Sequence, residues 1–454
     1  QEKVLWADLR KSIGAPPDMS PDEGGTLSYL EIHGAELAKA LKFKPAERLN
    51  LITGDNGLGK TFLLESAWWA LSGQWAGLPI YPKARSGEEA KIVLEIAGET
   101  KNTERISVTY DRKNQRWATP RKRPTIPGLM IYARVDGSFA VWDPAKNYWG
   151  AHLGDDRNSS RYFVFTRDQV WDGLETQESG KTVTVINGLL RDWVTWQNQP
   201  EKYPFDVFRK ILFQLSPPSG GDLGHLEPGE PVRLPFDVKM IPTIKHSYGT
   251  IPILHAAAGV KRIVTLAYLI VWAWEEHKIH SAFINKAPQQ RIVIMVDEIE
   301  AHLHPQWQRV ILPALINAND NLSSNLKVQF LIATHSPLVT ASIEPHFQTS
   351  TDKLFHLDID KKERSRYGVS LDEVPFIPHG RVDAWLISDI FELKHARSLE
   401  AEKSIEAAKK LQLESKPEPD EVKKVTEQLL KYLAADDEFW PRWKYFAEKH
   451  GTNL

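Results

Sequence analysis

The 454-residue sequence has no cysteine, and this absence excludes disulfide bonds and thiolate-bound metals. It also lacks an uninterrupted apolar run of about 18 residues and a charged-then-apolar leader, so we expect neither a transmembrane helix nor a secretory signal. The formal net charge is only −2, which gives the chain as a whole no attraction for nucleic acid or anionic membranes. These absences predict a soluble, cytoplasmic protein without a membrane partner.

The sequence does contain a complete phosphate-binding motif, G-x-x-x-x-G-K-[ST], at residues 54–61. The stretch 48–53 is interpreted as a short buried strand, and the apolar residues of 62–71 are typical of a helix packed on a sheet. A glycine-rich loop arising by chance would not be expected between a strand and a helix in this order. The residues expected to bind the nucleotide are Gly54, Asn56, Gly57, Gly59, Lys60 and Thr61.

Physical chemistry explains why each residue type occurs at its position in this motif. Glycines let successive backbone N–H groups point inward around the phosphates, and the following helix adds the positive end of its dipole. Lys60 places a positive charge between the β- and γ-phosphates, and the Thr61 hydroxyl can bind Mg²⁺. We therefore expect ATP and Mg²⁺ as cofactors.

Two apolar strands in the second half of the chain end in residues that suit phosphate chemistry. The first, 291–296, runs into Asp297 and Glu298, and the second, 330–333, is followed by His335. Asp297 is expected to hold the Mg²⁺ shell, directly or through water. Glu298 and His335 are the candidate catalytic residues, Glu298 for the attacking water and His335 for that water or the γ-phosphate. For the acidic pair, the alternative is a solvated strand end.

Further polar residues could bind a metal ion. Gln169 follows a strand-like run and precedes a turn, so its amide could reach Mg²⁺ and the attacking water; a surface glutamine is the equal alternative. Glu300, His302 and His304 have a spacing that would suit a metal site on a strand. They directly follow Glu298, where the family resemblance described below implies a loop at a subunit interface, and we prefer that interpretation.

Arg121, Lys122 and Arg123 form a basic cluster shortly after Trp117. Positive charge beside an aromatic ring can contact a phosphate backbone. Nothing in the sequence shows that these groups converge, so a solvated hairpin tip is the preferred interpretation. Contact with nucleic acid at this loop remains the alternative.

Together these motifs resemble the ATP-binding-cassette class of P-loop ATPases, in its soluble SMC-like, RecF-like and OLD-like branch of DNA repair and prokaryotic defence. In this resemblance, 54–61 is Walker A, 257–261 stands at the signature motif, Asp297 and Glu298 are Walker B, 300–305 is the D-loop and His335 is the switch histidine. The resemblance covers 27–73 and 241–360. It implies a head-to-tail homo-oligomer in which two subunits sandwich ATP, with Gly259 and Lys261 of one subunit facing the phosphate loop of the other.

The signature position departs from the family pattern. The family offers a serine hydroxyl and two glycines to the γ-phosphate, whereas Ala257 and Ala258 replace the serine and the first glycine here. The lost hydrogen bond to a charged group corresponds to roughly 1.5–3 kcal/mol. We therefore expect slow hydrolysis, with ATP serving more as a conformational ligand. The chain also lacks the long heptad arms of SMC proteins.

The expected fold is α/β: an ABC-type P-loop ATPase core with a β-rich insertion and a helical C-terminal region. The Pro/Gly-rich stretch 216–231 is interpreted as a connector that follows the insertion. Amphipathic helices are expected at 382–393, 398–413 and 421–434. The expected segments are 1–75 with Walker A, 76–240 as the β-rich and mixed insertion completing the first lobe, 241–379 with the signature helix, Walker B and switch histidine, and 380–454 as a docking region for a partner or oligomer.

The length and tail are similar to the ATPase component of two-gene antiphage systems of the Septu type, whose partner is a small HNH nuclease. This similarity implies an ATPase oligomer that restrains the nuclease and releases it when the nucleotide state changes. Asp358 and Asp360 end a predicted strand without a partner motif, so no nuclease centre is expected in this chain. The alternatives are a RecF-like repair or recombination ATPase, a scaffold that senses nucleotide and hardly hydrolyses it, and a transporter subunit. The insertion and the SMC-like motifs argue against the transporter subunit.

Overall fold

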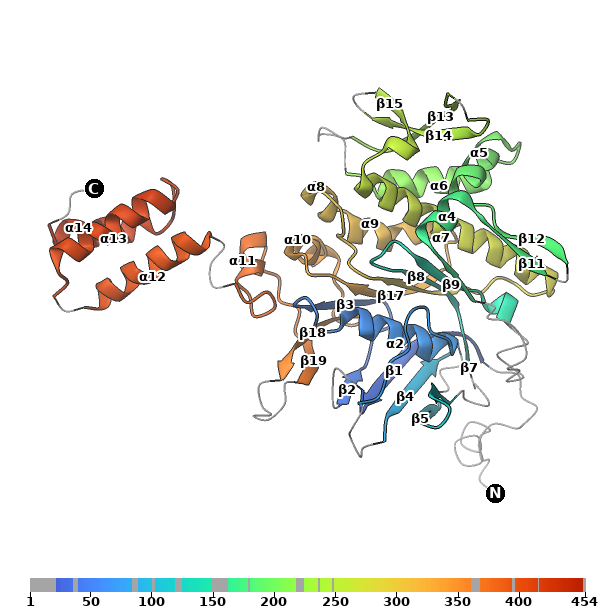
Figure 1. Cartoon of the computed structure of the whole chain (residues 1–454), viewed down its shortest axis with the longest axis horizontal. Coiled ribbons are helices and arrows are strands. Elements are labelled where there is room, and N and C mark those ends of the chain that lie inside the picture. Colours follow the sequence, from blue (N-terminus) through green and yellow to red (C-terminus); the bar gives the residue numbers. More distant parts are fainter. Residues whose placement is uncertain are drawn as a thin grey trace, which may run out of the picture. The chain divides into compact units, whose positions relative to one another are not determined.

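The computed structural model divides the chain into two units, Gln1–Gly380 and Arg381–Leu454, and each unit has a hydrophobic core of its own (Figure 1). The residues that the structure describes are 22–35, 40–83, 89–99, 103–118, 125–147, 162–178, 180–217, 224–235, 237–246, 249–360, 368–393, 397–414 and 416–451. None of the helices in these ranges combines the length and apolar character needed to cross a bilayer.

An eight-stranded sheet forms the centre of the first unit. In spatial order its strands are β10 (Tyr162–Phe165), β9 (Phe139–Trp142), β8 (Leu129–Ala133), β16 (Arg291–Val296), β17 (Lys327–Ala333), β3 (Leu49–Gly54), β18 (Asp352–Asp360) and β19 (Gly368–Val374). The five strands from β8 to β18 are parallel, and the strands at the two edges are antiparallel to their neighbours. β3 and β8 are buried along their whole length because both faces of the sheet are covered there; β8 is almost entirely apolar, and β3 also buries the polar Asn50 and Thr53.

Helix α2 (Lys60–Ser72) lies between this sheet and a second, mostly antiparallel sheet (Figure 1). The second sheet contains β1 (Asp22–His33), β2 (Ala40–Phe43), β4 (Lys91–Ala97), β5 (Arg105–Asp111), β6 (Arg116–Trp117) and β7 (Thr125–Pro127). Because α2 is covered on both sides it buries nearly all of its residues, including Trp68. The helix that follows the phosphate loop is therefore fixed on two sides.

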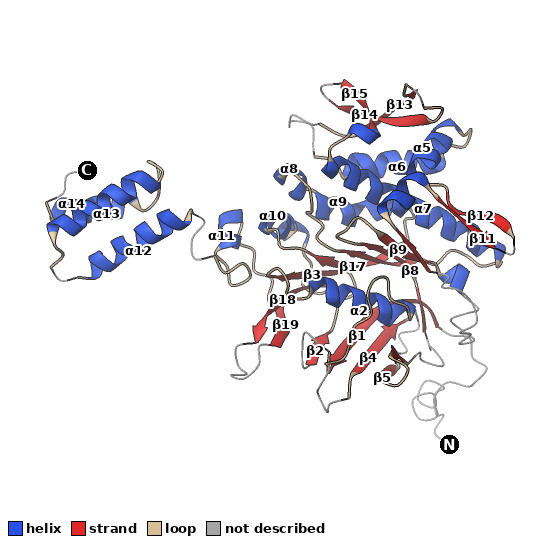
Figure 2. Ribbon diagram, viewed as in Figure 1, coloured by secondary structure: helices blue, strands red, loops and turns tan. Residues whose placement is uncertain are grey.

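Helices cover the opposite face of the central sheet (Figure 2), and the longest of them, α7 (Ala258–Phe283), packs against β8. Further helices of this unit include α4 (Arg167–Asp172), α5 (Leu189–Asn198), α6 (Tyr203–Gln214), α8 (Pro305–Gln308), α9 (Ile311–Ala318) and α10 (Pro337–Ser342), with short 3₁₀ turns η1 (Ile253–His255), η2 (Asn319–Asn321) and η3 (Glu344–His346). Two small sheets complete it: the hairpin of β11 (Leu174–Glu178) and β12 (Lys181–Ile186), and the sheet of β13 (Glu227–Arg233), β14 (Met240–His246) and β15 (Gly249–Pro252).

The second unit is helical, with α11 (Val382–Leu386), α12 (Leu399–Leu413), α13 (Pro419–Tyr432) and α14 (Trp440–Lys449). Ser398 caps α12, because its side chain accepts a hydrogen bond from the backbone N–H of Ala401 at 3.2 Å. Trp443 is fully buried in this unit, and its indole N–H donates to the Thr426 hydroxyl at 3.1 Å. The C-terminal aromatic residues therefore build a core within their own unit.

The structure confirms the predicted α/β class and corrects two expectations. The helix expected at 382–393 ends at Leu386, where Ser388 donates its hydroxyl to the Trp385 carbonyl and interrupts the helical bonding. The connector expected at 216–231 is not wholly irregular, because β13 begins at Glu227 within it. The basic cluster at 121–123 lies outside the described residues.

Candidate nucleotide site

The phosphate loop follows β3 at the edge where the parallel strands have their carboxyl ends. Gly54 closes β3 with φ +142°, and a Cβ there would lie 2.6 Å from the backbone oxygen of Leu357 on β18. Gly59 caps α2 with φ +98°, a left-handed conformation that glycine adopts without strain. Gly57 and Asn56 lie between them, and the Asn56 N–H donates to the Asp55 carboxylate at 2.7 Å. The close backbone approach at Gly54 and the positive φ at Gly59 therefore explain why glycine occupies these two positions.

The Lys60 side chain turns back into the loop. Its ammonium donates to the backbone oxygens of Gly54 at 2.7 Å and Asp55 at 3.1 Å. Burial lowers the pKa of Lys60, while the negative charges of Glu298 and Asp297 oppose this shift. A buried cation that donates to backbone carbonyls at the start of a helix attracts an anion.

Thr61 and Asp297 join the phosphate loop to the end of β16. The Thr61 hydroxyl donates to Asp297 Oδ2 at 2.6 Å. Asp297 is 1% exposed, and its other oxygen, Oδ1, is buried without a hydrogen-bond partner among the residues that the structure describes. Burial raises the pKa of Asp297, and the hydrogen bond from Thr61 partly offsets this effect. A hydroxyl and a carboxylate with a free oxygen therefore meet where the sequence predicts the metal.

Glu298 and His335 face one another across the ends of β16 and β17. The distance from His335 Nε2 to Glu298 Oε1 is 3.8 Å, too long for a hydrogen bond, and about a third of each side chain is exposed. His335 Nδ1 has no hydrogen-bond partner in the described part of the chain. Glu298 has φ +49°, an uncommon value for a residue with a side chain. The two candidate catalytic residues are thus brought together but are not engaged with each other.

Glu300 fixes the segment that carries His335, a role that its place in the predicted D-loop did not indicate. Its carboxylate accepts hydrogen bonds from the Thr334 hydroxyl and from the His335 backbone N–H, both at 2.7 Å. It is buried, which strengthens such charge-assisted bonds. No group of three metal-ligating side chains occurs among the described residues, so the interpretation of Glu300, His302 and His304 as a metal site gains no support.

Arg262 is a site residue that the sequence analysis did not single out. Its guanidinium donates to the backbone oxygens of Asp297 and Glu298, each at 2.9 Å. Its signal in the sequence is a basic residue directly after the predicted signature position. Arg262 thereby connects the first turn of α7 to both acidic residues.

The signature residues contact other parts of their own chain. A Cβ at Gly259 would lie 2.7 Å from the His302 backbone oxygen, so α7 and the segment after β16 are in close contact. The Lys261 ammonium donates to the Leu254 carbonyl at 2.6 Å. No contact among the described residues joins either one to the phosphate loop. Their predicted role across a subunit interface stays a prediction.

Gln169 is held in a local capping box at the start of α4. Its amide oxygen accepts from the Thr166 N–H at 2.9 Å, and its own N–H donates to the Thr166 hydroxyl at 3.3 Å. In the described residues, these bonds do not bring Gln169 to Thr61 or Asp297. Its role as a metal ligand stays a prediction that this conformation does not support.

The site fits Mg²⁺ and a nucleoside triphosphate. Thr61 and Asp297 supply the oxygen donors that Mg²⁺ prefers, and the partnerless Oδ1 is buried where a cation would satisfy it. Lys60 and the N-terminus of α2 supply positive charge for phosphates. The partnerless His335 Nδ1 adds a further polar group at the same edge of the sheet.

Family models match most of the first unit. A model described as an AAA domain matches residues 29–216, and one described as an AAA ATPase domain matches residues 195–340. These matches contain the phosphate loop and the strand ends described above. The chain therefore carries a P-loop ATPase domain, and the predicted enzyme class is confirmed.

Three curated relatives come from bacterial systems. The chain is 26% identical over 158 residues to the Retron Ec83 probable ATPase of Escherichia coli, covering 35% of this chain and 25% of that protein. It is 41% identical over 51 residues to the Retron Vc95 probable ATPase of Vibrio cholerae serotype O1 biovar El Tor, covering 11% and 9%. It is 22% identical over 374 residues to Septu protein PtuA of Bacillus thuringiensis, covering 81% and 83%. The chain thus spans a quarter or less of the two retron proteins.

Two solved structures are similar over most of this chain. An SMC head bound to the C-winged helix domain of ScpA has a TM-score of 0.38 at 14% identity and covers 77% of this chain and 98% of its own. An ATP-analogue complex of the recombination mediator protein RecF has a TM-score of 0.36 at 12% identity and covers 79% and 100%.

Proposed function

We propose that this chain is the cytoplasmic ATPase subunit of an antiphage defence complex, in which it binds Mg²⁺-ATP, hydrolyses it slowly and regulates a partner HNH nuclease. The observation that carries the nucleotide part is the hydrogen bond from Thr61 to Asp297, because it joins the two halves of the site. The similarity to Septu protein PtuA, which extends over 81% of the chain, supports the defence role.

In this proposal each residue of the site has a separate role. Lys60 and the loop N–H groups bind the β- and γ-phosphates, and Thr61 and Asp297 would hold Mg²⁺, which neutralises charge that develops on the phosphates. Glu298 accepts the proton of the attacking water, and His335, whose Nε2 lies 3.8 Å from Glu298 Oε1, orients that water or the γ-phosphate.

A sandwich of two copies is the assembly we propose. Gly259 and Lys261 lie at the start of α7 and make no contact with the phosphate loop of their own chain among the described residues. A second copy placed head to tail would bring its α7 N-terminus, with a positive dipole end, to the γ-phosphate. Ala257 provides no hydroxyl there, which supports slow turnover.

Nucleotide binding and hydrolysis are tested by separate substitutions. Lys60→Ala is expected to weaken ATP affinity at least about 10-fold, since a charge-assisted hydrogen bond contributes about 1.5–3 kcal/mol and 1.4 kcal/mol is tenfold. Glu298→Gln is expected to retain binding and lower single-turnover hydrolysis about 10²- to 10⁴-fold. Glu427→Gln, at an exposed position of α13, is the matched control and should leave hydrolysis unchanged. Equal rates for wild type and Glu298→Gln would contradict the assigned role.

The Mg²⁺ ligands are tested through stability. ATP should raise the melting temperature of the wild type further when Mg²⁺ is present, because Thr61 and Asp297 would hold the ion beside the triphosphate. In Asp297→Ala, Mg²⁺ should make no difference to this shift. A Mg²⁺-dependent shift that persists in Asp297→Ala would place the ion elsewhere.

The assembly is tested by the mass of Glu298→Gln in solution, because this variant retains bound ATP. On addition of Mg²⁺-ATP, the mass in solution should rise to that of a dimer or of a larger oligomer. Lys60→Ala should show no such increase. A Glu298→Gln protein that binds ATP yet stays monomeric at micromolar concentration would overturn the sandwich.

The defence role is tested by co-expressing the chain with the nuclease encoded beside it and challenging the cells with phages. We expect protection with the wild-type pair, and its loss when Lys60 is replaced by alanine. Copurification of the two proteins should persist in Lys60→Ala if nucleotide controls release and not assembly. A neighbouring gene without a nuclease, or protection that survives Lys60→Ala, would reject this part of the proposal.

A second candidate is a sensor that binds ATP and hardly hydrolyses it, and Ala257 favours it. Ala257 is the N-cap residue of α7 and offers no side-chain hydrogen bond. Ala257→Ser restores the hydroxyl that the family signature provides. If the chain is a slow enzyme, the rate should rise about 10-fold or more. An unmeasurable rate in both proteins would favour the sensor.

A further inference from the structure

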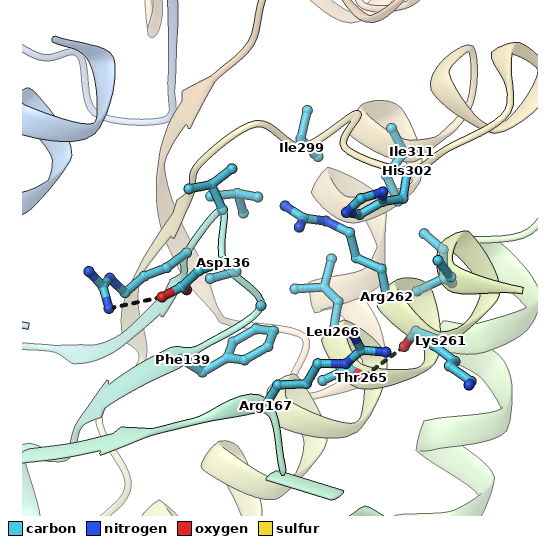
Figure 3. A pocket seen from close by; sticks show the side chains of 17 residues that line it. Asp136, Phe139, Arg167, Lys261, Arg262, Thr265, Leu266, Ile299, His302 and Ile311 are labelled. Carbon is cyan, nitrogen blue, oxygen red and sulfur yellow. Dashed lines mark hydrogen bonds and ion pairs between the residues drawn. The ribbon is translucent and has the colours of Figure 1, made fainter. Parts of the chain in front are cut away.

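A cavity of about 160 Å³ lies beside the nucleotide site, between the first turns of α7, the hairpin of β8 and β9, and the segment after β16. Figure 3 shows the labelled side chains that surround it. Apolar walls are formed by Phe139, Val296, Ile263, Leu266, Ile299 and Ile311. A cavity of about 150 Å³ with apolar walls accommodates one benzene ring. The space is therefore large enough for a single aromatic or heterocyclic ring.

Positive charge borders the same cavity. Arg167, Lys261 and Arg262 all contribute to its lining. Lys261 and Arg262 are partly engaged with backbone oxygens, whereas the Arg167 guanidinium has no hydrogen-bond or ion-pair partner in the part of the chain that the structure describes. The Arg167 stem lies against Gly137 at the β8–β9 turn, with its Cδ 3.6 Å from a Cβ built there. The Arg167 stem is therefore held in place by packing, and no partner among the described residues competes with a ligand for its guanidinium.

The acidic residue of the lining does not cancel this charge. Asp136 accepts hydrogen bonds from the backbone N–H of Ser138 at 2.9 Å and also from its hydroxyl, and it lies 3.6 Å from Arg134. Arg134 is in turn bonded to Glu65 at 3.0 Å. Among the residues that line the cavity, Asp136 is offset by Arg134, so Arg167, Lys261 and Arg262 leave the lining positively charged.

From this combination we propose a binding site for a small organic anion: one apolar ring inside the cavity and a phosphate or carboxylate at its mouth, facing Arg167. The ring gains from leaving water for the apolar walls, and the anion gains a charge-assisted hydrogen bond from Arg167, whose guanidinium has none among the described residues. A neutral ring or an inorganic anion satisfies only half of the site.

The position of the site connects it to nucleotide binding. Arg262, which lines the cavity, holds the backbone oxygens of Asp297 and Glu298. Val296 on the cavity wall directly precedes Asp297. A ligand that moves Arg262 would therefore change the support of the acidic pair, and by reciprocity nucleotide would change the affinity of the cavity for its ligand.

The test uses phenyl phosphate as the probe, titrated calorimetrically into the full chain, with benzyl alcohol and inorganic phosphate as half-ligands. Phenyl phosphate should bind about 10-fold more tightly than either half-ligand, because only it uses both the walls and Arg167. Arg167→Glu should weaken it by about 10-fold or more, and Ile263→Trp, which fills the cavity, should abolish binding. Lys210→Glu makes the same charge reversal at an exposed position outside the lining and should have no effect.

One further variant separates this site from the phosphate loop, which also attracts phosphates. Phenyl phosphate should bind Lys60→Ala with wild-type affinity. Binding lost in Lys60→Ala would assign the probe to the nucleotide site and overturn the inference, whatever the fate of the proposed function. Wild-type affinity in Arg167→Glu, or affinity no better than that of inorganic phosphate, would overturn it as well.

Discussion

Replacement of Gly259 by alanine tests the contact between α7 and the segment after β16. The added Cβ would lie 2.7 Å from the His302 backbone oxygen and 3.5 Å from a Leu303 methyl carbon. Backbone cannot rotate away as a flexible side chain can, and His302 is fixed at φ +63°. Either the start of α7 or this segment has to shift.

The expected cost follows from two opposing effects. Overpacking costs about 1–3 kcal/mol, and alanine gains at most about 1 kcal/mol over glycine in a helix, so the net loss should be about 1 kcal/mol. Gly368→Ala provides the matched control, since a Cβ there meets nothing within 4 Å and its φ lies outside the left-handed region. Its effect should stay within about 0.5 kcal/mol.

The assay is urea unfolding of the nucleotide-free protein, which separates this contact from any role of Gly259 in binding ATP. The midpoint for Gly259→Ala should fall relative to the wild type and to Gly368→Ala. If Gly259→Ala is more stable than the wild type, the close contact does not exist in solution and the helix propensity of alanine decides the outcome.

Three further predictions concern stability. Trp443→Ala should cost about 3–5 kcal/mol, because a fully buried indole is removed from the core of the second unit. Ala257→Ser should stabilise the chain by about 1 kcal/mol, because serine caps α7. Asp143→Asn should destabilise it by about 2 kcal/mol at pH 7, since the Asp143 carboxylate pairs with His277 at 2.8 Å and His280 at 3.0 Å. The pKa of Asp143 is lowered in spite of burial, chiefly by these histidine bonds, so its contribution is present above the unfolded value of about 3.9 and is lost as pH falls below it.

Each of these predictions has a measurement that could contradict it. Trp443→Ala should remove the transition of the second unit in a calorimetric scan, and an unchanged scan would show that the core does not depend on this residue. Ala257→Ser should raise the urea midpoint, and a lower midpoint would exclude capping. For Asp143→Asn, the difference from wild type should shrink as pH falls from 5 to 2, and a constant difference would show that the charge of Asp143 does not matter.

The parts of the fold that could be predicted are those specified by residues that are contiguous in the sequence. The strand before the phosphate loop and the helix after it are confirmed, because an apolar run and a glycine motif specify them locally. The strands that carry Asp297 and His335 are confirmed for the same reason. Parallel strands end at one edge of a sheet, so their neighbouring positions also followed from the pattern.

The remaining features depend on contacts between distant residues. Arg262 donates to residues 35 and 36 positions away, and Glu300 bonds to residues 34 and 35 positions away. No periodicity in a single sequence records such pairs. Gln169 follows a strand, which made it a candidate metal ligand beside the equal alternative of a surface glutamine; in the structure Thr166, three residues earlier, holds it in a capping box, and its role at a metal stays a prediction. The helix expected to 393 ends early because the Ser388 hydroxyl competes for backbone oxygens.

The carboxylate of Glu300 links two segments that belong to different strands. Its two oxygens bind the Thr334 hydroxyl and the His335 backbone, while its own backbone belongs to the segment that Gly259 touches. A displacement of this segment would therefore act first on the backbone of His335, and the imidazole would move with it.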